Sequence, residues 1–309
     1  MDVAPGPREL TLYVTSACDA ACAFCRRESP AGIYQAGTMR PEFVRAVLAR
    51  FPTVMGVCIA GFGEPLLVPW LGEIVAACRE AGAFVGVITN GSRLAERLDE
   101  VAAWDLGGFG YVSVSLNATT AAEHQRVFGF ARPCWPDVLG ALAALVERGV
   151  NAGASFVVTR RTLGELPAMI ALARALKLRF AHVHNFLPHN GPDDPAFLAD
   201  VLREGDLEVE VAMRAARAAA AGAPISLPTL LPAAGEPSPS RCESPFMSIG
   251  VDARGHVTGC RRVYEPSPMF GNIADPDVWH APHFARYREE LGGGQPNATC
   301  RACFGSVKG

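Results

Sequence analysis

The segment ELTLYVTSACDAACAFC, residues 9–25, places three cysteines directly behind a strand-like run. Residues 9–16 alternate apolar and polar side chains, a period of two that is typical of a β-strand. Cys18, Cys22 and Cys25 follow, separated by three and then two residues. With ten cysteines in 309 residues, this triplet would arise by chance only about 0.01 times. The segment therefore predicts a loop at the carboxyl end of a first strand that carries cysteines for a chemical purpose.

The order of a short β-rich run and a longer helical stretch recurs through the first 190 residues. Residues 39–51 carry apolar side chains at helical spacing, with Thr38 as a candidate N-cap. Further strands are expected at residues 54–61, 84–89, 111–116, 152–159 and 180–186, separated by helices centred near residues 75, 98, 143 and 170. Six such units predict an α/β fold whose parallel sheet curls into an open barrel. In such folds the loops behind the strands carry the chemistry.

The composition describes a globular protein and excludes several classes. Hydrophobic residues make up 50% of the chain and charged residues 19%, and 28 basic against 31 acidic residues give a net charge of −3. Disordered and fibrous classes are excluded, and no basic face for nucleic acid is expected. No apolar run approaches the roughly 20 residues of a membrane span, and the first residues lack a signal-peptide pattern. We therefore expect a cytoplasmic protein with neither nucleic-acid nor membrane partners, in which cysteines serve more often as ligands than in disulfides.

The alternation of strand-like and helical segments changes after residue 190. We predict a barrel over residues 1–190, a helical segment with a Pro-rich linker over 191–241, and a small domain over 242–309. Within the middle part, a helix is expected from Asp194 to about Ala221. The small domain contains a hairpin-like stretch, SIGVDARGHVTGC, and a helix near residues 284–291. So short a segment buries only a small hydrophobic core, so we expect a bound metal to stabilise it.

The cysteine spacings point to iron and sulfur more than to zinc. Three thiolates in one loop suit three corners of a cubane iron–sulfur cluster and leave the fourth iron open. Zinc prefers four protein ligands, or three and a water, and half of a zinc knuckle is the alternative reading of the triplet. The small domain holds four more cysteines, Cys242, Cys260, Cys300 and Cys303. These four thiolates fit a structural zinc ribbon as well as a second cluster.

With this loop behind its first strand, the chain resembles the radical SAM family, whose hallmark is a CxxxCxxC loop in a partial (β/α)6 barrel. Residues 61–65, GFGEP, resemble the GGE segment that binds the SAM amino group, with Phe62 in place of a common glycine. The resemblance implies that the cluster is held by Cys18, Cys22 and Cys25, and that SAM is contacted by Phe24, Gly61, Gly63, Glu64, Asn90, Ser115, Asn117 and Arg160. It also implies that SAM binds the open iron and is cleaved by one electron to a 5′-deoxyadenosyl radical. Flavodoxin or ferredoxin is then the expected electron donor.

The C-terminal residues resemble the SPASM and Twitch auxiliary-cluster domains. The shared features are Gly271-Asn272-Ile273, Trp279 and the closing CRACFG. The full SPASM pattern has more cysteines, so the resemblance favours the shorter Twitch form with one auxiliary 4Fe-4S cluster. That cluster would be held by Cys242, Cys260, Cys300 and Cys303.

The resemblance fixes the reaction class more closely than the substrate. The first cysteine stands at residue 18, which leaves no room for a leader-binding domain before it. We therefore expect a small hydroxylated substrate (a sugar, aminoglycoside or aminocyclitol) that is oxidised to a ketone or epimerised in antibiotic biosynthesis. The alternative is a maturase that modifies a ribosomal peptide. A zinc-stabilised binding protein without catalytic activity is the alternative of another class.

Three further groups have both a functional and a structural reading. Cys134 follows the fourth strand, where a thiol can return a hydrogen atom to a substrate radical, or can be inert. Cys58 and Cys78 are expected in the core. His182 and His184 alternate along the sixth strand and either face the barrel interior toward substrate or are satisfied interior groups. For His280 and His283 we predict no metal.

Overall fold

The structure, a computed structural model, describes residues 3–22, 25, 37–61, 63–186, 199–231, 233, 242–260 and 270–293. Its sheet has nine strands in the order β7-β6-β5-β4-β3-β2-β1-β8-β9, and all neighbours are parallel except the antiparallel pair β8 and β9. The strands are β1 (Glu9–Tyr13), β2 (Gly56–Ala60), β3 (Phe84–Thr89), β4 (Tyr111–Ser115), β5 (Ala152–Val158), β6 (Ala181–Asn185), β7 (Ile225–Ser226), β8 (Ser248–Asp252) and β9 (Val257–Thr258). The expected α/β fold with a parallel sheet is confirmed.

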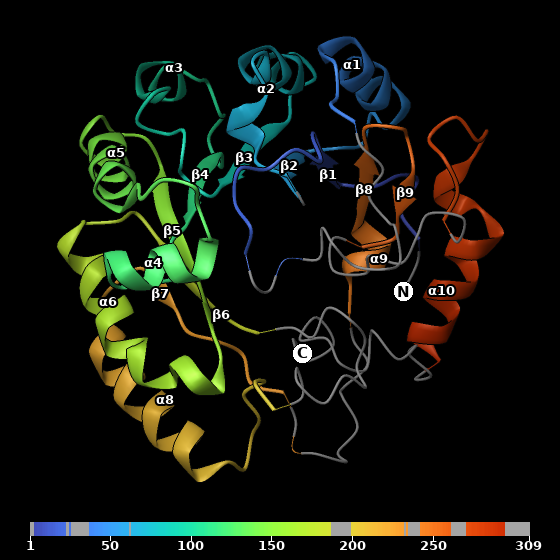
Figure 1. The fold of residues 1–309 in the computed structure, drawn as a ribbon. Helices are drawn as coiled ribbons and strands as arrows, with labels where there is room; N and C mark the ends of the chain where they lie inside the picture. Colours follow the sequence, from blue (N-terminus) through green and yellow to red (C-terminus); the bar gives the residue numbers. More distant parts are fainter. Residues whose placement is uncertain are drawn as a thin grey trace.

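Six helices, α1, α2, α3, α5, α6 and α8, lie outside the curve of the sheet, as Figure 1 shows. The α-helices are α1 (Pro41–Arg50), α2 (Leu71–Glu80), α3 (Leu98–Ala102), α4 (Ala121–Phe128), α5 (Trp135–Glu147), α6 (Leu166–Ala175), α8 (Leu207–Ala220), α9 (Ser244–Met247) and α10 (Pro282–Gly292). The described residues also form the 3₁₀ helices η2 (Pro65–Leu67), η3 (Arg160–Glu165) and η5 (Val278–His280). The crossovers expected between the first six strands are present, although α3 is a single short helix.

The two faces of the sheet differ in chemistry because successive side chains of a strand point to opposite sides. One face is apolar and belongs to the same core as the helices, with Leu12, Ile59, Val87, Val114 and Phe156 all buried. The register places on the other face the smaller and more polar set Cys58, Ser113, Ser115, Ser155, His182 and His184. We call this second side, which faces away from the helices, the inner face.

Two local expectations for the helices were wrong. Thr38 does not cap α1: the N-cap is Arg40 with a proline behind it, and the Thr38 hydroxyl lies 3.0 Å from that of Thr15. Of the helix expected from Asp194 to about Ala221, the described residues are helical only from Leu207, because Asp206 accepts the N–H groups of the first turn of α8. Residues 194–198 of that expectation lie outside the described residues. Helix α4 was not predicted, because its eight residues are too short for a clear apolar period.

The C-terminal part continues the barrel sheet. The predicted hairpin is present as β8 and β9, and β8 pairs with β1 in parallel, with Glu9 opposite Ser248. The predicted helix near residues 284–291 is present as α10. Its residue Phe284 belongs, with Trp279, to the same apolar core as the barrel strands. The described residues behind 242 therefore share their core with the barrel, and a separate domain over 242–309 stays a prediction.

Aromatic rings cover glycines of neighbouring strands on the inner face. A Cβ atom built on Gly56 would lie 2.4 Å from the Phe84 ring, and one on Gly86 would lie 2.4 Å from the Tyr111 ring. The same relation holds between Gly250 and Tyr13, at 2.8 Å. A glycine in a strand leaves room for a cross-strand ring, which then packs over the bare backbone.

Gly86→Ala is expected to lower the free energy of unfolding by about 1–3 kcal/mol, the usual cost of overpacking a core. The new methyl group must displace the Tyr111 ring, whose hydroxyl lies 3.8 Å from the Cys58 sulfur. Urea unfolding followed by circular dichroism measures the effect. Gly108→Ala is the matched control, because a Cβ atom there would meet nothing within 4 Å. Equal losses in both variants would mean that the ring does not require this glycine.

Candidate functional site

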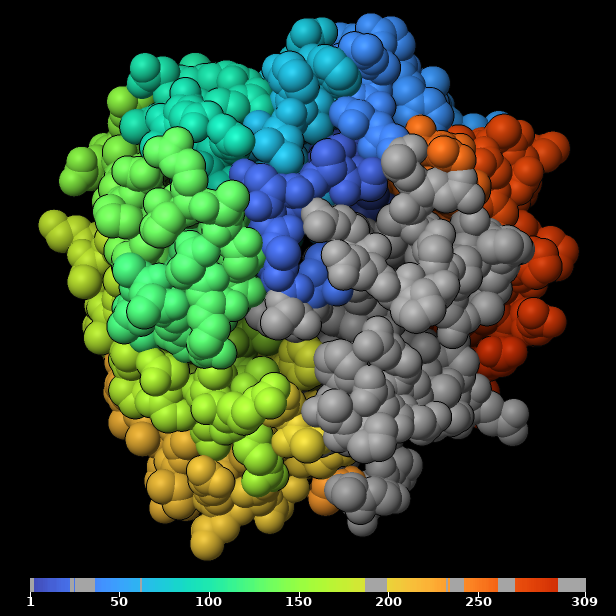
Figure 2. Space-filling model, viewed as in Figure 1, coloured from blue at the N-terminus to red at the C-terminus, as the bar shows by residue number. Residues whose placement is uncertain are grey.

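The cysteine loop leaves β1 at the carboxyl edge of the sheet. In Figure 2 its dark blue atoms lie near the centre of the visible face, beside the green atoms of the α4 region. A backbone hydrogen bond of 2.7 Å from Ala21 N–H to the Phe128 carbonyl ties the loop to the end of α4. The carboxyl ends of β2, β3 and β4 lie at the same edge, because these strands are parallel to β1. The expected position of the chemistry, behind the strand ends, is therefore where the cysteines lie.

Glu64 connects the segment behind β2 to the end of β3. It is 1% exposed, and its carboxylate accepts hydrogen bonds from Leu66 N–H (2.9 Å), the Thr89 hydroxyl (2.5 Å) and Asn90 N–H (2.6 Å). Burial raises the pKa of Glu64 to about 7, against the three donors and with a small contribution from Asp19 in the same direction as burial. The carboxylate thus stabilises two loops, and its predicted contact with the SAM amino group remains a prediction.

The glycines before Glu64 allow a close approach of backbone to backbone. A Cβ atom on Gly63 would lie 2.3 Å from the Thr15 carbonyl oxygen and 2.6 Å from that of Ala17. Glu64 N–H donates to the same Ala17 carbonyl at 2.8 Å. Gly61 has a φ of +139°, which side chains rarely permit. The space that a side chain at Gly63 would need is filled by the loop that leads to Cys18, and the predicted contacts of Gly61 and Gly63 to SAM remain predictions.

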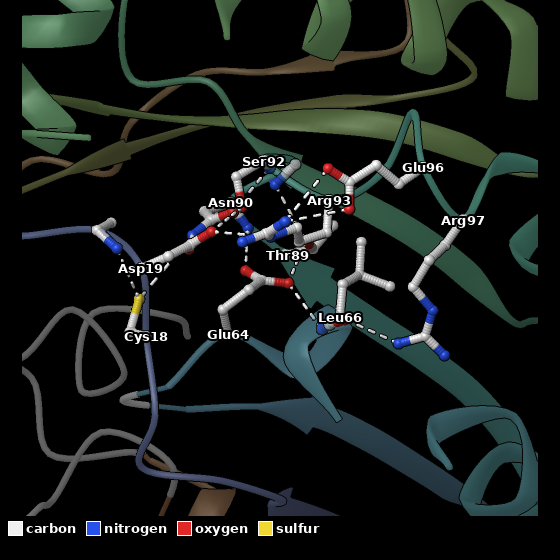
Figure 3. Close-up of polar contacts among 12 residues, drawn as sticks. Cys18, Asp19, Glu64, Leu66, Thr89, Asn90, Ser92, Arg93, Glu96 and Arg97 are labelled. Atoms are coloured by element: carbon white, nitrogen blue, oxygen red, sulfur yellow. Dashed lines mark hydrogen bonds and ion pairs between the residues drawn. The ribbon is translucent and has the colours of Figure 1, made fainter. Parts of the chain in front are cut away.

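Asp19, next to the first cysteine, is the centre of a polar network that sequence reasoning missed (Figure 3). Its carboxylate accepts hydrogen bonds from the Asn90 amide (3.0 Å) and the Ser92 hydroxyl (2.7 Å), and Arg93 lies 3.4 Å away as an ion pair. All three partners follow β3. The only sequence signal was the run Thr89-Asn90-Gly91, which marks the end of the strand without showing where Asn90 points.

The environment of Cys18 suits a thiolate. Its sulfur accepts hydrogen bonds from Ala20 N–H at 3.4 Å and from the Asn90 amide at 3.9 Å. A metal-bound thiolate needs such N–H donors. Three cysteine sulfurs on one loop are the donor set of a 4Fe-4S cluster with one open iron. Within the described ranges, no three His, Cys, Asp or Glu side chains converge on a common point as metal ligands would. Ligation by Cys18, Cys22 and Cys25 therefore stays a prediction, with which the donor set agrees.

The other predicted SAM contacts that the structure describes lie at the ends of β4 and β5. Ser115 is the last residue of β4 and Asn117 follows it. Both bond to β5: Ser115 accepts from the Ser155 hydroxyl at 3.4 Å, and Asn117 accepts Val157 N–H at 2.9 Å. Asn117 has a φ of +49°, so it turns the chain sharply there. Arg160 is paired with Asp206, the N-cap of α8. Phe24, like Phe62, lies outside the described residues.

Cys134 packs against the same aromatic cluster as the cysteine loop. Phe128 and Phe130 are buried with Ala20, and Cys18, Cys22 and Cys134 pack against them. Burial first, and the nearby carboxylates of Asp19 and Asp137 second, raise the pKa of the Cys134 thiol. The thiol therefore keeps its hydrogen at neutral pH, as a hydrogen donor must. Its role as such a donor is still a prediction.

His124 was missed by sequence reasoning. Its ring packs 4.7 Å from that of Phe128 and 4.9 Å from that of Trp135, and burial lowers its pKa to about 4. The imidazole is therefore neutral at neutral pH. It packs in the aromatic cluster beside the cysteine loop. No sequence pattern distinguishes it from a surface histidine of a short helix.

His182 and His184 lie on the inner face and are exposed. Their rings are 6.0 Å apart, and His182 Nδ1 lies 2.7 Å from the Ser226 hydroxyl of β7. The first of the two readings, side chains directed into the barrel interior, fits this placement. Cys78 is fully buried as expected, and burial raises its pKa to about 12. Cys58 is half-buried on the inner face, so it is not an ordinary core residue.

The tail cysteines are described only in part. Cys260 is buried and donates to the Ser244 hydroxyl at 3.4 Å, while Cys242 is half-buried two residues before that serine. Cys300 and Cys303 lie outside the described residues. His280 pairs with Asp277 at 2.9 Å. Ligation of an auxiliary cluster by the four cysteines remains a prediction.

The chain is similar to proteins with named activities. The PqqA peptide cyclase of Xanthomonas oryzae pv. oryzae is 31% identical over 195 residues, which cover 60% of this chain and 50% of that protein. The chain thus spans about half the length of this relative. The PqqA peptide cyclase of Xanthomonas campestris pv. campestris is 27% identical over 307 residues, covering 93% of this chain and 77% of the relative.

Solved structures share the fold. Streptococcus suis SuiB bound to S-adenosylmethionine has a TM-score of 0.72 at 14% identity, covering 97% of this chain and 73% of that one. Native anSMEcpe with bound AdoMet has a TM-score of 0.67 at 14% identity, covering 90% of this chain and 82% of that one. At these identities the likeness concerns the fold alone.

Two family profiles match, and between them they include both cysteine groups. The profile of the Radical SAM superfamily matches residues 12–173, and the SPASM profile, an iron–sulfur cluster-binding domain, matches residues 242–304. The cofactors are therefore SAM, the 4Fe-4S cluster that binds it, and SPASM auxiliary iron–sulfur clusters. No helix among the described residues is long and apolar enough to cross a membrane. With more than half of its length matched by the first profile, the chain belongs to the radical SAM superfamily and carries a C-terminal SPASM domain.

Proposed function

We propose that this chain is a radical SAM enzyme that modifies a peptide. The observation that carries the proposal is the similarity to proteins named PqqA peptide cyclase, one of which aligns over 93% of this chain. Among structures of the same fold, SuiB is described bound to a precursor peptide and anSMEcpe bound to a peptide. These relatives favour the alternative reading of the sequence over the small hydroxylated substrate that we expected first, and over a zinc-stabilised binding protein.

The inner face of the sheet suits a substrate with many hydrogen-bonding groups. His182, His184 and Ser226 are exposed there, and Ser155 lies opposite His182 in the register. Imidazole and hydroxyl groups both donate and accept hydrogen bonds, and so do the amides of a peptide. When bound at the cluster, SAM supplies a radical that removes hydrogen from an unreactive C–H bond. The protein's own residues hold the loop and the substrate in place.

The experiment compares two classes of substrate under anaerobic conditions. Iron-loaded protein is incubated with SAM and dithionite, with either synthetic peptides from short reading frames beside its gene or a panel of sugars and aminocyclitols. We expect one peptide to stimulate 5′-deoxyadenosine formation and to lose the mass of two hydrogens, as formation of an internal bond requires. Stimulation by a polyol and by none of the peptides would return the enzyme to the sugar-oxidising or epimerising class. Cys22→Ala is the control without a competent cluster.

Cys134→Ala separates two roles for this thiol in the same assay. If Cys134 only packs against the aromatic cluster, the variant forms the same product in similar yield. Loss of product with retained 5′-deoxyadenosine formation would identify Cys134 as the donor of a hydrogen atom, the step that an epimerase needs.

A further inference from the structure

We infer that Asn90 tunes the reduction potential of the SAM-binding cluster, by donating an amide N–H to the sulfur of Cys18 and by holding the cysteine loop through Asp19. The inference concerns a positioning residue of the loop and does not depend on the substrate class. Asn90 was expected from the sequence only as a contact to SAM. Its side chain points to the cysteine loop, as Figure 3 shows.

The Asn90 side chain is fixed at both ends of its amide group. The amide nitrogen lies 3.0 Å from Asp19 Oδ1 and 3.9 Å from Cys18 Sγ, while the amide oxygen accepts Ser92 N–H at 2.8 Å. Its backbone N–H donates to the buried Glu64 carboxylate at 2.6 Å. Asn90 is 8% exposed. A flip of the amide would break all three side-chain contacts, so the N–H groups stay directed at the loop.

The charges around the cysteine loop determine how this donor affects the reduction potential of the cluster. The Asp19 carboxylate next to Cys18 disfavours the added electron of a reduced cluster, and Arg93 at 3.4 Å offsets that charge only in part because it is 42% exposed. An N–H directed at a cluster thiolate stabilises the reduced cluster, which carries one more negative charge, more than the oxidised one. Ala20 N–H supplies a similar donor from the loop itself. Asn90 supplies a side-chain donor, and it reaches Cys18 from the end of β3.

The test is a reductive titration of the iron-loaded protein, followed by electron paramagnetic resonance. The signal of this cluster is recognised by its change when SAM is added. In Asn90→Ala, the ratio of reduced to oxidised cluster at a fixed potential should fall about tenfold, which is a shift of about 59 mV for one electron. Ser92→Ala is the matched control, because it removes one hydroxyl donor to Asp19 and no contact to Cys18. Its ratio should stay within about twofold of the wild type.

Equal midpoint potentials in the wild type and Asn90→Ala, at equal iron content, would overturn the inference. If Asn90→Ala does not retain iron, Asn90→Ser is measured, since serine keeps an oxygen for Ser92 N–H but is too short to reach Cys18. Loss of iron from both variants, with unchanged thermal unfolding of the metal-free protein, would support the holding role through Asp19. Loss of iron together with a lower unfolding temperature of the metal-free protein would make Asn90 a residue of the fold and contradict the inference.

Discussion

Glu64→Ala is expected to lower the free energy of unfolding by about 3–5 kcal/mol at pH 5. The variant leaves Leu66 N–H, Asn90 N–H and the Thr89 hydroxyl without an acceptor in a place that water does not reach. An unsatisfied buried donor costs about 1–3 kcal/mol, and three neighbouring losses add only in part. Urea unfolding followed by circular dichroism, on protein kept free of oxygen, measures the change.

The effect of Glu64→Ala depends on pH in a direction that the burial of this carboxyl determines. Its folded pKa of about 7 lies above the ordinary value of 4.5, so the folded protein binds the proton more tightly than the unfolded chain. The stability that Glu64 contributes is therefore fully present below pH 4.5 and declines as the pH rises through 7. The difference between wild type and Glu64→Ala should shrink by about 2–3 kcal/mol between pH 5 and pH 8. A difference that grows with pH would mean that the three donors outweigh burial.

Glu96→Ala is the matched control for Glu64→Ala. Glu96 pairs with Arg93 at 3.1 Å, but its side chain is 64% exposed. Exposed ion pairs contribute little, so the control should change the free energy of unfolding by less than about 0.5 kcal/mol at either pH. Comparable losses in the two variants would contradict the special position of Glu64.

Gly63→Ala is expected to slow reductive cleavage of SAM about 100-fold or more and to destabilise the protein by about 1–3 kcal/mol. The methyl group would stand 2.3 Å from the Thr15 carbonyl oxygen and 2.6 Å from that of Ala17. Both are backbone atoms of the loop before Cys18, so the loop itself has to move. The assay measures 5′-deoxyadenosine formed with SAM and dithionite, and it needs no second substrate.

Gly140→Ala is the control for the effect of an added methyl group. Gly140 lies on an exposed position of α5, and a Cβ atom there meets nothing within 4 Å. Alanine is the better helix former by about 1 kcal/mol, so this variant should be slightly more stable than wild type and equally active. If Gly63→Ala retains wild-type cleavage, the close approach of the two loops does not position the cluster.

The first six strands could be predicted from the sequence because each is recognisable from the local pattern of its apolar residues. The six strands of the barrel differ from their predicted ranges by at most a few residues, and β3 (Phe84–Thr89) agrees at both ends. The helix predictions failed at Asp206, where capping decides the boundary, and at α4, whose eight residues give no clear apolar period. The strand pairing of β8 with β1 was out of reach, since their partners Glu9 and Ser248 are far apart in the chain.

By itself the sequence determined the class of the protein: the CxxxCxxC loop, the repeated β/α order and the C-terminal cysteine motifs are local patterns, and through them the chain resembles the radical SAM and SPASM families, whose profiles match it. Only the tertiary structure decided what Glu64, Asn90 and Asp19 do. Each of them bonds to groups on another loop, across contacts of 2.6 to 3.0 Å that join the ends of different strands. Periodicity and spacing describe one stretch of chain at a time, whereas hydrogen bonds across parallel strand ends exist only after the sheet has formed.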